Sequence, residues 1–485
     1  MYSVISVVNN NCKKMLKKKK RSFIGEVIFR VLRNYLRLCH NNMYYKNIYV
    51  LGKENIPEKG TPLIIASNHQ NALNDALGVE FAFRDRVVSI FTRADAFNRP
   101  FIGKFLRSIY LLPAFRIDFD GVDALKNNFD IFAEAGERIL EGGSVLIFPE
   151  ALNQDKRWLG DFSLGYLRMA FDAAKKSDFK ADIKILPLIN HYSNYFKFRE
   201  DMIIQCGEPV SLKEYYELYQ TKPRTAQRNV NALVRQRIAD MMLNITDLEN
   251  YEAIDYIRET YGFKYCTDCG GDKKFLPDKL ASDKALFQEL ESIKQEDPQT
   301  IETIYSEALT LKKNCKRFTI IDENFDIPWK PWSLLIRFLC LILLFPLFVV
   351  ASIPNILIFL SPYPLTKKFK AGNAHMTMFV GGIRFAVGSL VAFPVIYGLF
   401  FAVESYFWNW WCSLLHLICL PSLGLFAWTY RKFFIGLKRE WRFHVRSKRS
   451  EHERRGTGLK ETINLRKTLF EKLDKILKKE AWRKE

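Results

Sequence analysis

Residues 61–75 read TPLIIASNHQNALND, and this stretch decides the fold. Its first six residues form a short apolar run with the length and composition of a buried strand. The run opens into a polar segment that contains His69, and Asp75 follows six positions later. Six residues on one straight helix amount to about 600°, which leaves the two side chains about 120° from a common face. A turn, for which Asn71 or Asn74 is suited, is therefore required if the imidazole and the carboxylate are to meet.

Five other short runs have the character of strands, and two longer stretches have the spacing of helices. The strand candidates are 47–52, 86–92, 144–150, 183–192 and 201–210, and the helix candidates are 122–140 and 163–176. Strands that alternate with helices predict an α/β domain over residues 43–212, with a mostly parallel sheet flanked by helices. Functional groups in such folds gather beyond the carboxyl ends of the strands. His69 and Glu150 both occupy such ends, so we expect them to share one cleft.

The chain of 485 residues carries 73 Lys and Arg against 53 Asp and Glu, a formal net charge of +20. This balance indicates an anionic partner, either nucleic acid or a membrane surface. Residues 338–360 and 405–430 contain no Lys, Arg, Asp or Glu, and each is long enough to cross a bilayer, which takes about 20 apolar residues. Because the sequence has no recognisable nucleic-acid-binding module, the predicted partner is an anionic phospholipid membrane and no nucleic acid.

The membrane-embedded region is predicted over residues 328–437, and its topology follows from charge. Lys and Arg residues stand before the first apolar run, after it and after the last one, and cytoplasmic loops collect such residues. All three flanks are therefore expected on the cytoplasmic face, together with the active domain. This placement requires the first run to be a re-entrant hairpin, broken by Pro346 and Pro354, and 385–430 to be a tight hairpin around Glu404. Three full crossings, the alternative, would place the basic C-terminal tail on the opposite face.

Three polar segments complete the predicted organisation. Residues 1–42 combine a basic cluster with an amphipathic helix over 22–38, whose charges exclude a secretory signal core and whose arginines are expected to face lipid phosphates. A helix packed on the soluble core is the alternative for this segment. Residues 213–327 are polar and mostly helical, with no assignable chemistry, and residues 438–485 form a charged tail that ends in a helix with one apolar face.

The nine cysteines are odd in number and scattered, as expected of reduced residues on the cytosolic side. Cys266 and Cys269 are spaced like half of a zinc site, but no second pair or histidine follows at ligand spacing. The sequence therefore predicts no metal site and no cofactor.

The histidine and the aspartate at the end of the first strand suit acid–base chemistry. An imidazole transfers protons near neutral pH, and it is a better general base when a carboxylate holds its other nitrogen. His69 and Asp75 could therefore deprotonate a hydroxyl group. Further along the chain, apolar segments deliver Arg116 to a loop in AFRID and Glu150 to a loop in FPEA.

These fragments, in this order, resemble the blocks of the glycerolipid acyltransferase superfamily, and the resemblance covers about residues 44–212. SNHQNALND is similar to the family's NH…D block, AFRID to its second block, FPEA to its FPEG block and ILPL to its fourth. The hydrophobic C-terminal part resembles the membrane-bound glycerol-3-phosphate branch. By this resemblance His69 is the base and Asp75 its orienting partner. The residues that it assigns to the acceptor site are Asn68, Arg116 and Glu150.

Two positions depart from the family pattern. The family usually has four residues between the histidine and the aspartate, whereas five stand here and the usual aspartate position is Asn74. Some glycerol-3-phosphate members share the longer spacing, so Asp75 is favoured. The glycine of FPEG is Ala151. Because glycine permits a close backbone approach, the acceptor phosphate is expected to be held differently here, by Lys156 or Arg157.

The resemblance implies a membrane-bound O-acyltransferase of phospholipid synthesis. The acyl donor would be a thioester of coenzyme A or acyl carrier protein, and the acceptor glycerol 3-phosphate or lysophosphatidate. Direct transfer needs no serine or cysteine nucleophile, and nothing in the sequence resembles GxSxG. Each acyl CH₂ moved from lipid to water costs about 0.8 kcal/mol, so we expect the site to open toward the bilayer. The alternatives are an enzyme for a different lysolipid, including a remodelling enzyme, and a non-catalytic membrane-surface scaffold.

Overall fold

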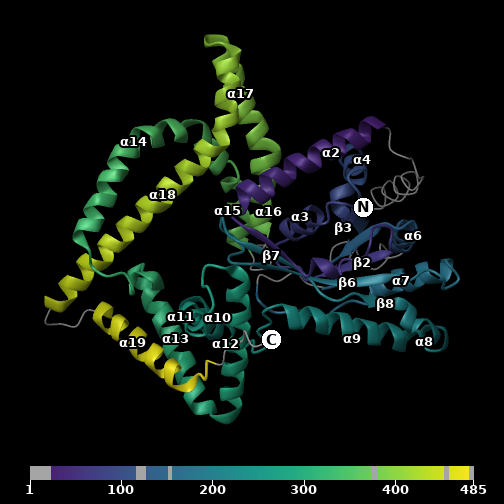
Figure 1. Cartoon of the computed structure of the whole chain (residues 1–485), viewed down its shortest axis with the longest axis horizontal. Coiled ribbons are helices and arrows are strands. Elements are labelled where there is room, and N and C mark those ends of the chain that lie inside the picture. The colour runs from purple at the N-terminus through teal and green to yellow at the C-terminus, as the bar shows by residue number, and fades with distance from the viewer. Residues whose placement is uncertain (1–22, 116–126, 151–155, 373–378, 453–457, 480–485) are drawn as a thin grey trace. The chain divides into compact units, whose positions relative to one another are not determined.

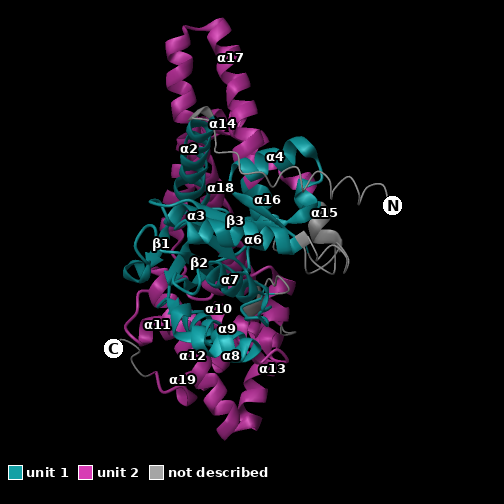
Figure 2. Cartoon of the chain, turned by 90° about the vertical axis from the view of Figure 1, so that its right-hand side faces the viewer, with its two compact units in different colours: residues 1–242, 366–385 teal, residues 243–365, 386–485 magenta. Residues whose placement is uncertain are grey.

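The structure is a computed structural model, and it describes residues 23–115, 127–150, 156–372, 379–452 and 458–479. Arg116, the basic cluster before residue 22 and positions 151–155 lie outside these ranges. The chain divides into two compact units. Unit 1 comprises residues 1–242 and 366–385, and unit 2 comprises residues 243–365 and 386–485 (Figure 2). Residues 213–242 of the predicted polar region therefore belong with the acyltransferase-like sequence, and the remainder belongs to unit 2.

Unit 1 is built on one eight-stranded sheet with the order β1-β7-β6-β2-β5-β3-β4, in which β8 pairs with β6. The strands are β1 (Ile48–Leu51), β2 (Leu63–Ser67), β3 (Val88–Arg93), β4 (Leu111–Ala114), β5 (Ser144–Ile147), β6 (Lys184–Tyr192), β7 (Met202–Cys206) and β8 (Val210–Ser211). Among the named strands of the described chain, only the pairs β6–β7 and β6–β8 are antiparallel. The predicted mostly parallel α/β sheet is confirmed, with β4 and β8 added to the six expected strands.

Strand β2 lies near the middle of the sheet, parallel to both of its neighbours, β5 and β6. All five of its residues are buried, which explains the continuous apolar run that encodes it. Because β2 and β5 are parallel neighbours, their carboxyl ends meet at one edge of the sheet. Strand β6 pairs with β2 up to Leu188 opposite Ser67 and then continues to Tyr192, so its last residues stand beside the segment that follows β2.

Helices cover the sheet of unit 1 (Figure 1). They are α2 (Phe23–Leu38), η1 (Cys39–Tyr44), η2 (Lys53–Asn55), α3 (Leu73–Ala82), η3 (Ala94–Phe97), α4 (Pro100–Ser108), α6 (Asn127–Leu140), α7 (Gly165–Lys176), η5 (Leu212–Tyr215), α8 (Tyr216–Thr221), α9 (Pro223–Met241), α15 (Tyr363–Gly372) and α16 (Phe379–Ala386). Helix α6 packs against β4 and β5, and α9 packs against β6. Both helices predicted within the domain are present, α6 over the described part of its range and α7 from Gly165.

Helix α2 combines both interpretations of the N-terminal segment. Its inner face packs on unit 1 through the buried Phe29. Arg33 donates to the carbonyl oxygens of Glu80 and Phe83 at 2.9 Å each, and its Nε lies 2.8 Å from the Glu80 carboxylate. The expectation that the arginines face lipid phosphates is therefore wrong for Arg33, because its charge is used inside the protein. The outer face leaves apolar side chains exposed at Val27, Ile28, Val31 and Leu38.

Unit 2 contains a layer of polar helices. They are α10 (Tyr251–Thr260), α11 (Gly262–Asp268), α12 (Leu276–Glu296), α13 (Pro298–Phe318), η6 (Asp322–Asn324) and α19 (Gly458–Ile476). The tail helix α19 was predicted, and it packs against α13 with Leu469 and Leu473 buried. Arg466 of α19 also forms paired hydrogen bonds of 2.7 to 2.9 Å with Asp322 and Asp326. These bonds join chain segments that precede and follow the apolar region.

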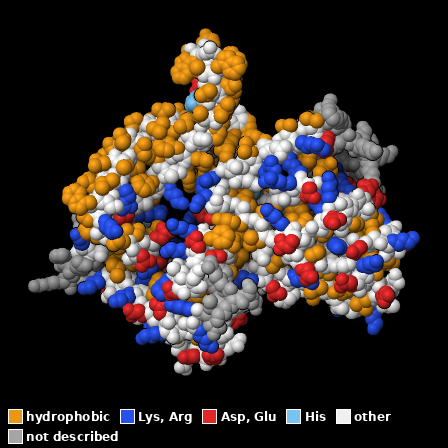
Figure 3. Space-filling model, viewed as in Figure 1, with side chains coloured by type: hydrophobic (Ala, Val, Ile, Leu, Met, Phe, Trp, Pro, Cys, Tyr) orange, Lys and Arg blue, Asp and Glu red, His pale blue; other side chains and the backbone are white. Residues whose placement is uncertain are grey.

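Three helical segments in the described chain are long and apolar enough to cross a membrane. They are α14 (Pro331–Leu360), the continuous segment Phe379–Phe407 formed by α16, η8 (Val387–Tyr397) and α17 (Gly398–Phe407), and α18 (Trp410–His452). Figure 3 shows hydrophobic side chains covering the unit 2 part of this region. The turn between α17 and α18 falls at Trp408 and Asn409, just beyond Glu404, where a hairpin was expected.

The prediction that Pro346 and Pro354 break the first apolar run into a hairpin is wrong, because both lie inside α14, which is one helix of 30 residues. Figure 1 shows α14 as a curved helix. Apolar helices in membrane-type bundles tolerate proline more readily than isolated helices do. Here Asn355 follows the second proline. Its side-chain amide donates to the carbonyls of Ala351 and Leu420, and its oxygen accepts from the Tyr397 hydroxyl at 2.7 Å, so one amide joins three helices.

Candidate active site

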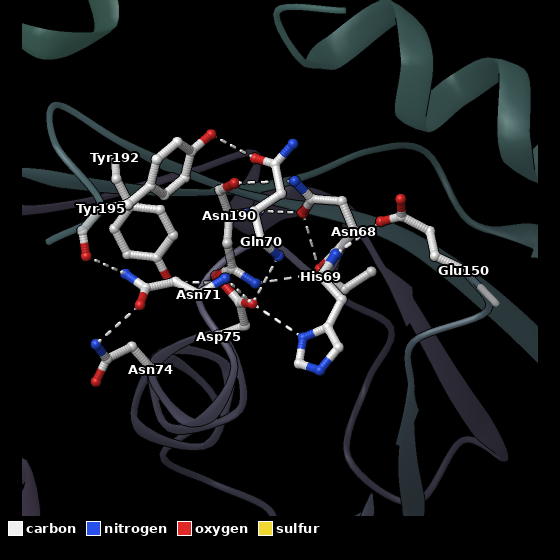
Figure 4. Close-up of polar contacts among 11 residues, drawn as sticks. Asn68, His69, Gln70, Asn71, Asn74, Asp75, Glu150, Asn190, Tyr192 and Tyr195 are labelled. Atoms are coloured by element: carbon white, nitrogen blue, oxygen red, sulfur yellow. Dashed lines mark hydrogen bonds and ion pairs between the residues drawn. The ribbon is translucent and has the colours of Figure 1, made fainter. Parts of the chain in front are cut away.

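The histidine and aspartate of the opening segment meet across a turn. His69 Nδ1 lies 3.0 Å from Asp75 Oδ2 (Figure 4). His69 belongs to the loop after β2, and Asp75 stands in the first turn of α3. Ala72 lies between them with φ of 44°, in a region of backbone space that L residues rarely adopt. The required turn is therefore present, and the conformation of one residue shows how sharply the chain bends.

Four donors surround the carboxylate of Asp75, whose side chain is fully buried. Besides His69, the backbone N–H groups of Gln70 and Asn71 donate to Oδ2 at 2.9 and 2.7 Å. The hydroxyl of Tyr192 donates to Oδ1 at 2.7 Å. A buried carboxylate is costly unless it is hydrogen-bonded, and these donors offset that cost. Asn74 makes its side-chain bond to Asn71 instead, so the structure pairs the imidazole with Asp75 and not with Asn74.

The bond to Asp75 fixes the orientation of the His69 ring. Because the carboxylate accepts, Nδ1 carries the proton, and the lone pair of the neutral ring is on Nε2. Nε2 makes no hydrogen bond to any residue of the described chain. The ring stacks on Phe148 with a centroid distance of 3.9 Å, and the side chain is 17% exposed. The arrangement commits Nδ1 to Asp75 and leaves the ring partly exposed.

Glu150 comes from the end of β5, the parallel neighbour of β2, and its carboxylate faces the same loop. It accepts from the backbone N–H of His69 at 2.8 Å and from that of Gly160 at 3.0 Å, one donor for each oxygen. Burial raises the pKa of Glu150, while these two N–H groups act in the opposite direction. The expected meeting of the two strand ends is found. In this structure, however, the Glu150 carboxylate secures the backbone of the histidine.

Asn68 and Gln70 tie the same loop to the chain beyond β2. The Asn68 amide donates to the carbonyl of Asn190 at 3.0 Å, and its oxygen accepts from the Asn190 N–H at 2.8 Å. The Gln70 oxygen accepts from the Tyr195 hydroxyl at 2.8 Å. Both polar groups of Asn68 are therefore used within the protein, on the side of the loop that faces β6.

The cationic residues expected at the acceptor site lie in different surroundings. Lys156 is exposed, and its carbonyl accepts from the Gln70 side chain at 2.9 Å. Arg157 is only 5% exposed, and its guanidinium donates to the carbonyl of Tyr192 at 3.2 Å. Arg116 lies outside the described residues. Lys156 and Arg157 are thus tied to segments that hold the dyad, one through its backbone and the other through its side chain.

Sequence reasoning missed the contribution of Tyr192. The residue ends β6, 117 positions after Asp75, and only the parallel pairing of β6 with β2 brings the two together. The run ILPLINHY that contains it is apolar enough to predict a strand, but an apolar strand does not reveal which of its residues reaches a distant carboxylate. Metal ligation has no candidate here, since no group of three or more His, Cys, Asp or Glu side chains within the described ranges could hold an ion.

The parallel sheet, the site at its carboxyl edge and the His–Asp pair together define an α/β acyltransferase-type domain. Residues 47–190 match the family model described as Acyltransferase, which supports an acyltransferase domain of the glycerolipid acyltransferase type in this part of the chain. The matched range begins before β1 and ends within β6, so it contains both members of the dyad.

Three curated relatives each match a little over a quarter of the chain. An uncharacterized acyltransferase of Schizosaccharomyces pombe is 26% identical over 136 residues, which are 27% of this chain and 20% of that protein. Glycerol-3-phosphate O-acyltransferase 2 of Saccharomyces cerevisiae is 25% identical over 28% of this chain and 18% of its own length. A chloroplastic 1-acyl-sn-glycerol-3-phosphate acyltransferase of Arabidopsis thaliana is 30% identical over 28% of this chain and 34% of its own length. The chain thus matches about a third or less of each relative.

Among solved structures, the chain is similar to the 1-acyl-sn-glycerophosphate acyltransferase PlsC from Thermotoga maritima. The match has 16% sequence identity and a TM-score of 0.30, and it covers 48% of this chain and 92% of that one.

Proposed function

We propose that this protein is a membrane-bound O-acyltransferase that moves a fatty acyl group from a thioester donor to a hydroxyl of glycerol 3-phosphate or lysophosphatidate. The observation that carries the proposal is the 3.0 Å contact between His69 Nδ1 and Asp75, on a histidine whose ring is partly exposed. The names of the yeast and plant relatives, which act on glycerol 3-phosphate and on its 1-acyl derivative, support the choice of acceptors.

The proposed reaction is a direct transfer. His69 Nε2 takes the proton of the acceptor hydroxyl while that oxygen attacks the thioester carbonyl. The tetrahedral intermediate then collapses, the C–S bond breaks, and the imidazolium returns the proton to the leaving thiolate. Asp75 favours the reaction because its negative charge stabilises the imidazolium that forms between these two steps. No covalent intermediate on the protein and no cofactor is required.

The acceptor phosphate is proposed to lie on the side of the loop from which Lys156 extends. Arg116 is proposed to join it as a planar donor to the phosphate. Because Arg157 is buried, its contribution would be to hold the chain beside Tyr192. The alanine at position 151, in place of the family's glycine, favours a second candidate acceptor, a different lysolipid.

We propose that the segment Phe379–Phe407 and α18 cross the bilayer as one hairpin, and that α14 enters the apolar layer without crossing it. Arg337, near the start of α14, forms two hydrogen bonds of 2.8 and 2.9 Å with Glu440, near the end of α18. The hydrogen bonds of Arg466 to Asp322 and Asp326 likewise join a segment after α18 to a segment before α14. The chain therefore enters and leaves the apolar region of unit 2 at one end, which supports an even number of crossings over three.

The depth that α14 reaches beside α18 supports the proposal that α14 does not cross the bilayer. Its residue Ile358 packs with Leu420 of α18, ten residues after Trp410. At 1.5 Å per residue Ile358 therefore lies about 15 Å short of the α17–α18 turn, and α14 ends two residues later. The turn carries exposed aromatic side chains of the kind that gather at a membrane interface. They are Tyr406, Phe407, Trp408, Trp410 and Trp411.

The base of the same hairpin carries the basic residues that mark a cytoplasmic face. They are Arg431, Lys432, Lys438, Arg439 and Arg442. No apolar helix of spanning length occurs in the described residues between the acyltransferase domain and α14, so the domain is proposed to lie on that face as well. Protease added to sealed, inside-out vesicles should remove the tail after residue 452, and protection of the tail there would contradict this topology.

The test of the function is an acceptor panel. Purified membranes that contain the full chain are incubated with labelled acyl thioester and with glycerol 3-phosphate, lysophosphatidate or other lysolipids, with the His69→Ala chain as control. Label on glycerol 3-phosphate or lysophosphatidate supports the proposal. Label only on other lysolipids supports the second candidate, an acyltransferase for a different lysolipid. A chain that labels no acceptor, or a control as active as the natural chain, would reject catalysis by this dyad.

A further inference from the structure

The first turns of the apolar segment Phe379–Phe407 lie against the turn that carries the dyad. Within unit 1, Gly381 and Gly382 of α16 provide this contact. A Cβ on Gly381 would lie 2.7 Å from Asn71 Oδ1, 3.1 Å from Asn74 Nδ2 and 3.0 Å from the carbonyl oxygen of Tyr195. A Cβ on Gly382 would lie 3.0 Å from the Cβ of Leu73. These distances are shorter than ordinary van der Waals contact, so the two positions admit only glycine without a shift of their neighbours.

The residues touched by this glycine pair are those that shape the dyad. The N–H of Asn71 donates to Asp75 at 2.7 Å, and Leu73 begins α3, the helix that supplies the carboxylate. Ala72, with its positive φ, stands between the two contacts. A displacement of α16 would therefore press on the one bend that lets the imidazole and the carboxylate meet.

Further bonds hold α16 in this place. The Tyr44 hydroxyl donates to the carbonyl oxygen of Gly381 at 3.0 Å, and Arg384 donates to the carbonyl of Phe196 at 2.5 Å. Phe385 is 3% exposed, and its ring packs edge-on against those of His40 and Tyr44. The beginning of an apolar, membrane-type helix is thus an integral part of the acyltransferase unit.

We propose that Gly381 and Gly382 are positioning residues, through which the apolar helix that they begin holds the His69–Asp75 turn in its working geometry. The inference rests on the proposed function, because it assumes that this dyad performs the transfer. Misplacement of reacting groups by about 1 Å can cost about a hundredfold in rate, so even a methyl group at this contact has a measurable effect.

The same continuous segment contains matched control positions. A Cβ on Gly388 or on Gly398 would meet nothing within 4 Å. Substitution at these sites changes helix propensity and apolarity as it does at Gly381, but adds no contact to the dyad turn. A difference between the two sets of variants therefore isolates the contact itself.

The experiment compares Gly381→Ala and Gly381→Val with Gly388→Ala and Gly388→Val, each in the full chain in membranes. kcat and KM are measured per amount of protein that elutes as a folded monodisperse species in detergent. We expect kcat to fall about tenfold for Gly381→Ala and further for Gly381→Val, with KM within about twofold, while both Gly388 variants match the natural chain. A kcat that is unchanged at position 381, an equal loss at position 388, or a rise in KM alone would overturn the inference.

Tyr44→Phe provides a second route should the Gly381 variants fail to fold. It removes only the hydroxyl that donates to Gly381, and we expect a smaller loss in kcat with KM unchanged. A folded Tyr44→Phe chain with full turnover would then overturn the inference. The unmodified chain distinguishes failure of this inference from failure of the proposed function. If the unmodified chain is inactive, the proposed function is rejected. If it is active and the Gly381 variants are equally active, only the role of the glycines is rejected.

Discussion

His69 and His40 are two histidines of unit 1 in contrasting surroundings, and both contact aromatic rings. His40 is fully buried, its ring meets Tyr45, Phe81 and Phe385 edge-on, and its Nδ1 lies 2.7 Å from the side-chain oxygen of Asn41. Burial lowers the pKa of His40 to about 4. His69 has a carboxylate on one nitrogen and an outward-facing nitrogen on the other side. The difference teaches that the polar partner and the access of the second nitrogen, and not the aromatic neighbours, make a histidine suitable as a base.

The strongest test of this contrast removes the proposed base. For His69→Ala we expect turnover to fall by about a thousandfold, within the range of general-base contributions. The variant should elute as a folded species, since the side chain is at the surface of the site. The transfer assay with labelled thioester measures the loss, and turnover within tenfold of the natural chain would show that His69 is no more a base than His40.

The next test concerns the partner of the imidazole. Asp75→Asn keeps the size of the side chain but removes the charge that stabilises the imidazolium, and we expect kcat to fall about a hundredfold. Asn74→Ala serves as the neighbouring control and should cost no more than a few-fold. Kinetic constants of the two purified variants decide the matter: a larger loss at position 74 would mean that the spacing usual in the family also governs this chain.

A smaller loss of kcat is expected for Tyr192, which contacts Asp75 and not the imidazole itself. Tyr192→Phe removes the hydroxyl that donates to Asp75 at 2.7 Å and leaves the ring in place. A hydrogen bond to a charged group contributes about 1.5 to 3 kcal/mol, so we expect kcat to fall roughly tenfold with KM unchanged. A variant in which KM rises instead would place the hydroxyl at the substrate and not behind the carboxylate.

The last test measures the stability of the protein. Because the pKa of His40 is lowered to about 4, the unfolded chain binds a proton at this residue below about pH 6.5 and the folded chain does not. Stability that is present at neutral pH is therefore lost as the pH falls from about 6.5 to 4, by about 3 kcal/mol in total for this residue. Denaturant unfolding in detergent at several pH values measures the slope.

His40→Leu should flatten that slope between pH 6.5 and 4. An unchanged slope would show that another group titrates in this window.

Much of the site was predictable because its central members are close in the sequence. The apolar run of β2 predicts a buried strand, and the six-residue spacing to Asp75 requires a turn, which the structure contains. The adjacency of Glu150 also follows from the rule that parallel strands end at one edge. The contacts of the Glu150 carboxylate could not be predicted in the same way. They depend on two backbone N–H groups, one from His69 and one from Gly160, that donate to it.

Other features depend on registers and partners that a single sequence does not encode locally. Tyr192 reaches Asp75 only through the pairing of β6 with β2, and Arg33 turns inward only because carbonyls at the end of α3 are available to it. The two prolines of α14 predicted a break in the helix because proline disrupts isolated helices. In the structure Asn355 lies beside the second proline and bonds to neighbouring helices, and that support is invisible in the apolar run itself.

The hydrogen bonds that Asn355 makes to neighbouring helices also have a consequence for biosynthesis. Two of its partners, Tyr397 and Leu420, follow it by 42 and 65 residues, so the ribosome has not yet made them when α14 emerges. At about 5 to 20 residues per second, the polar amide waits roughly 3 to 13 seconds for its second helix partner. The bonds that join α14 to its neighbours can therefore form only after the following helices have been synthesised, and a chain stalled before residue 397 would lack both of these contacts, a state suited to recognition by quality control.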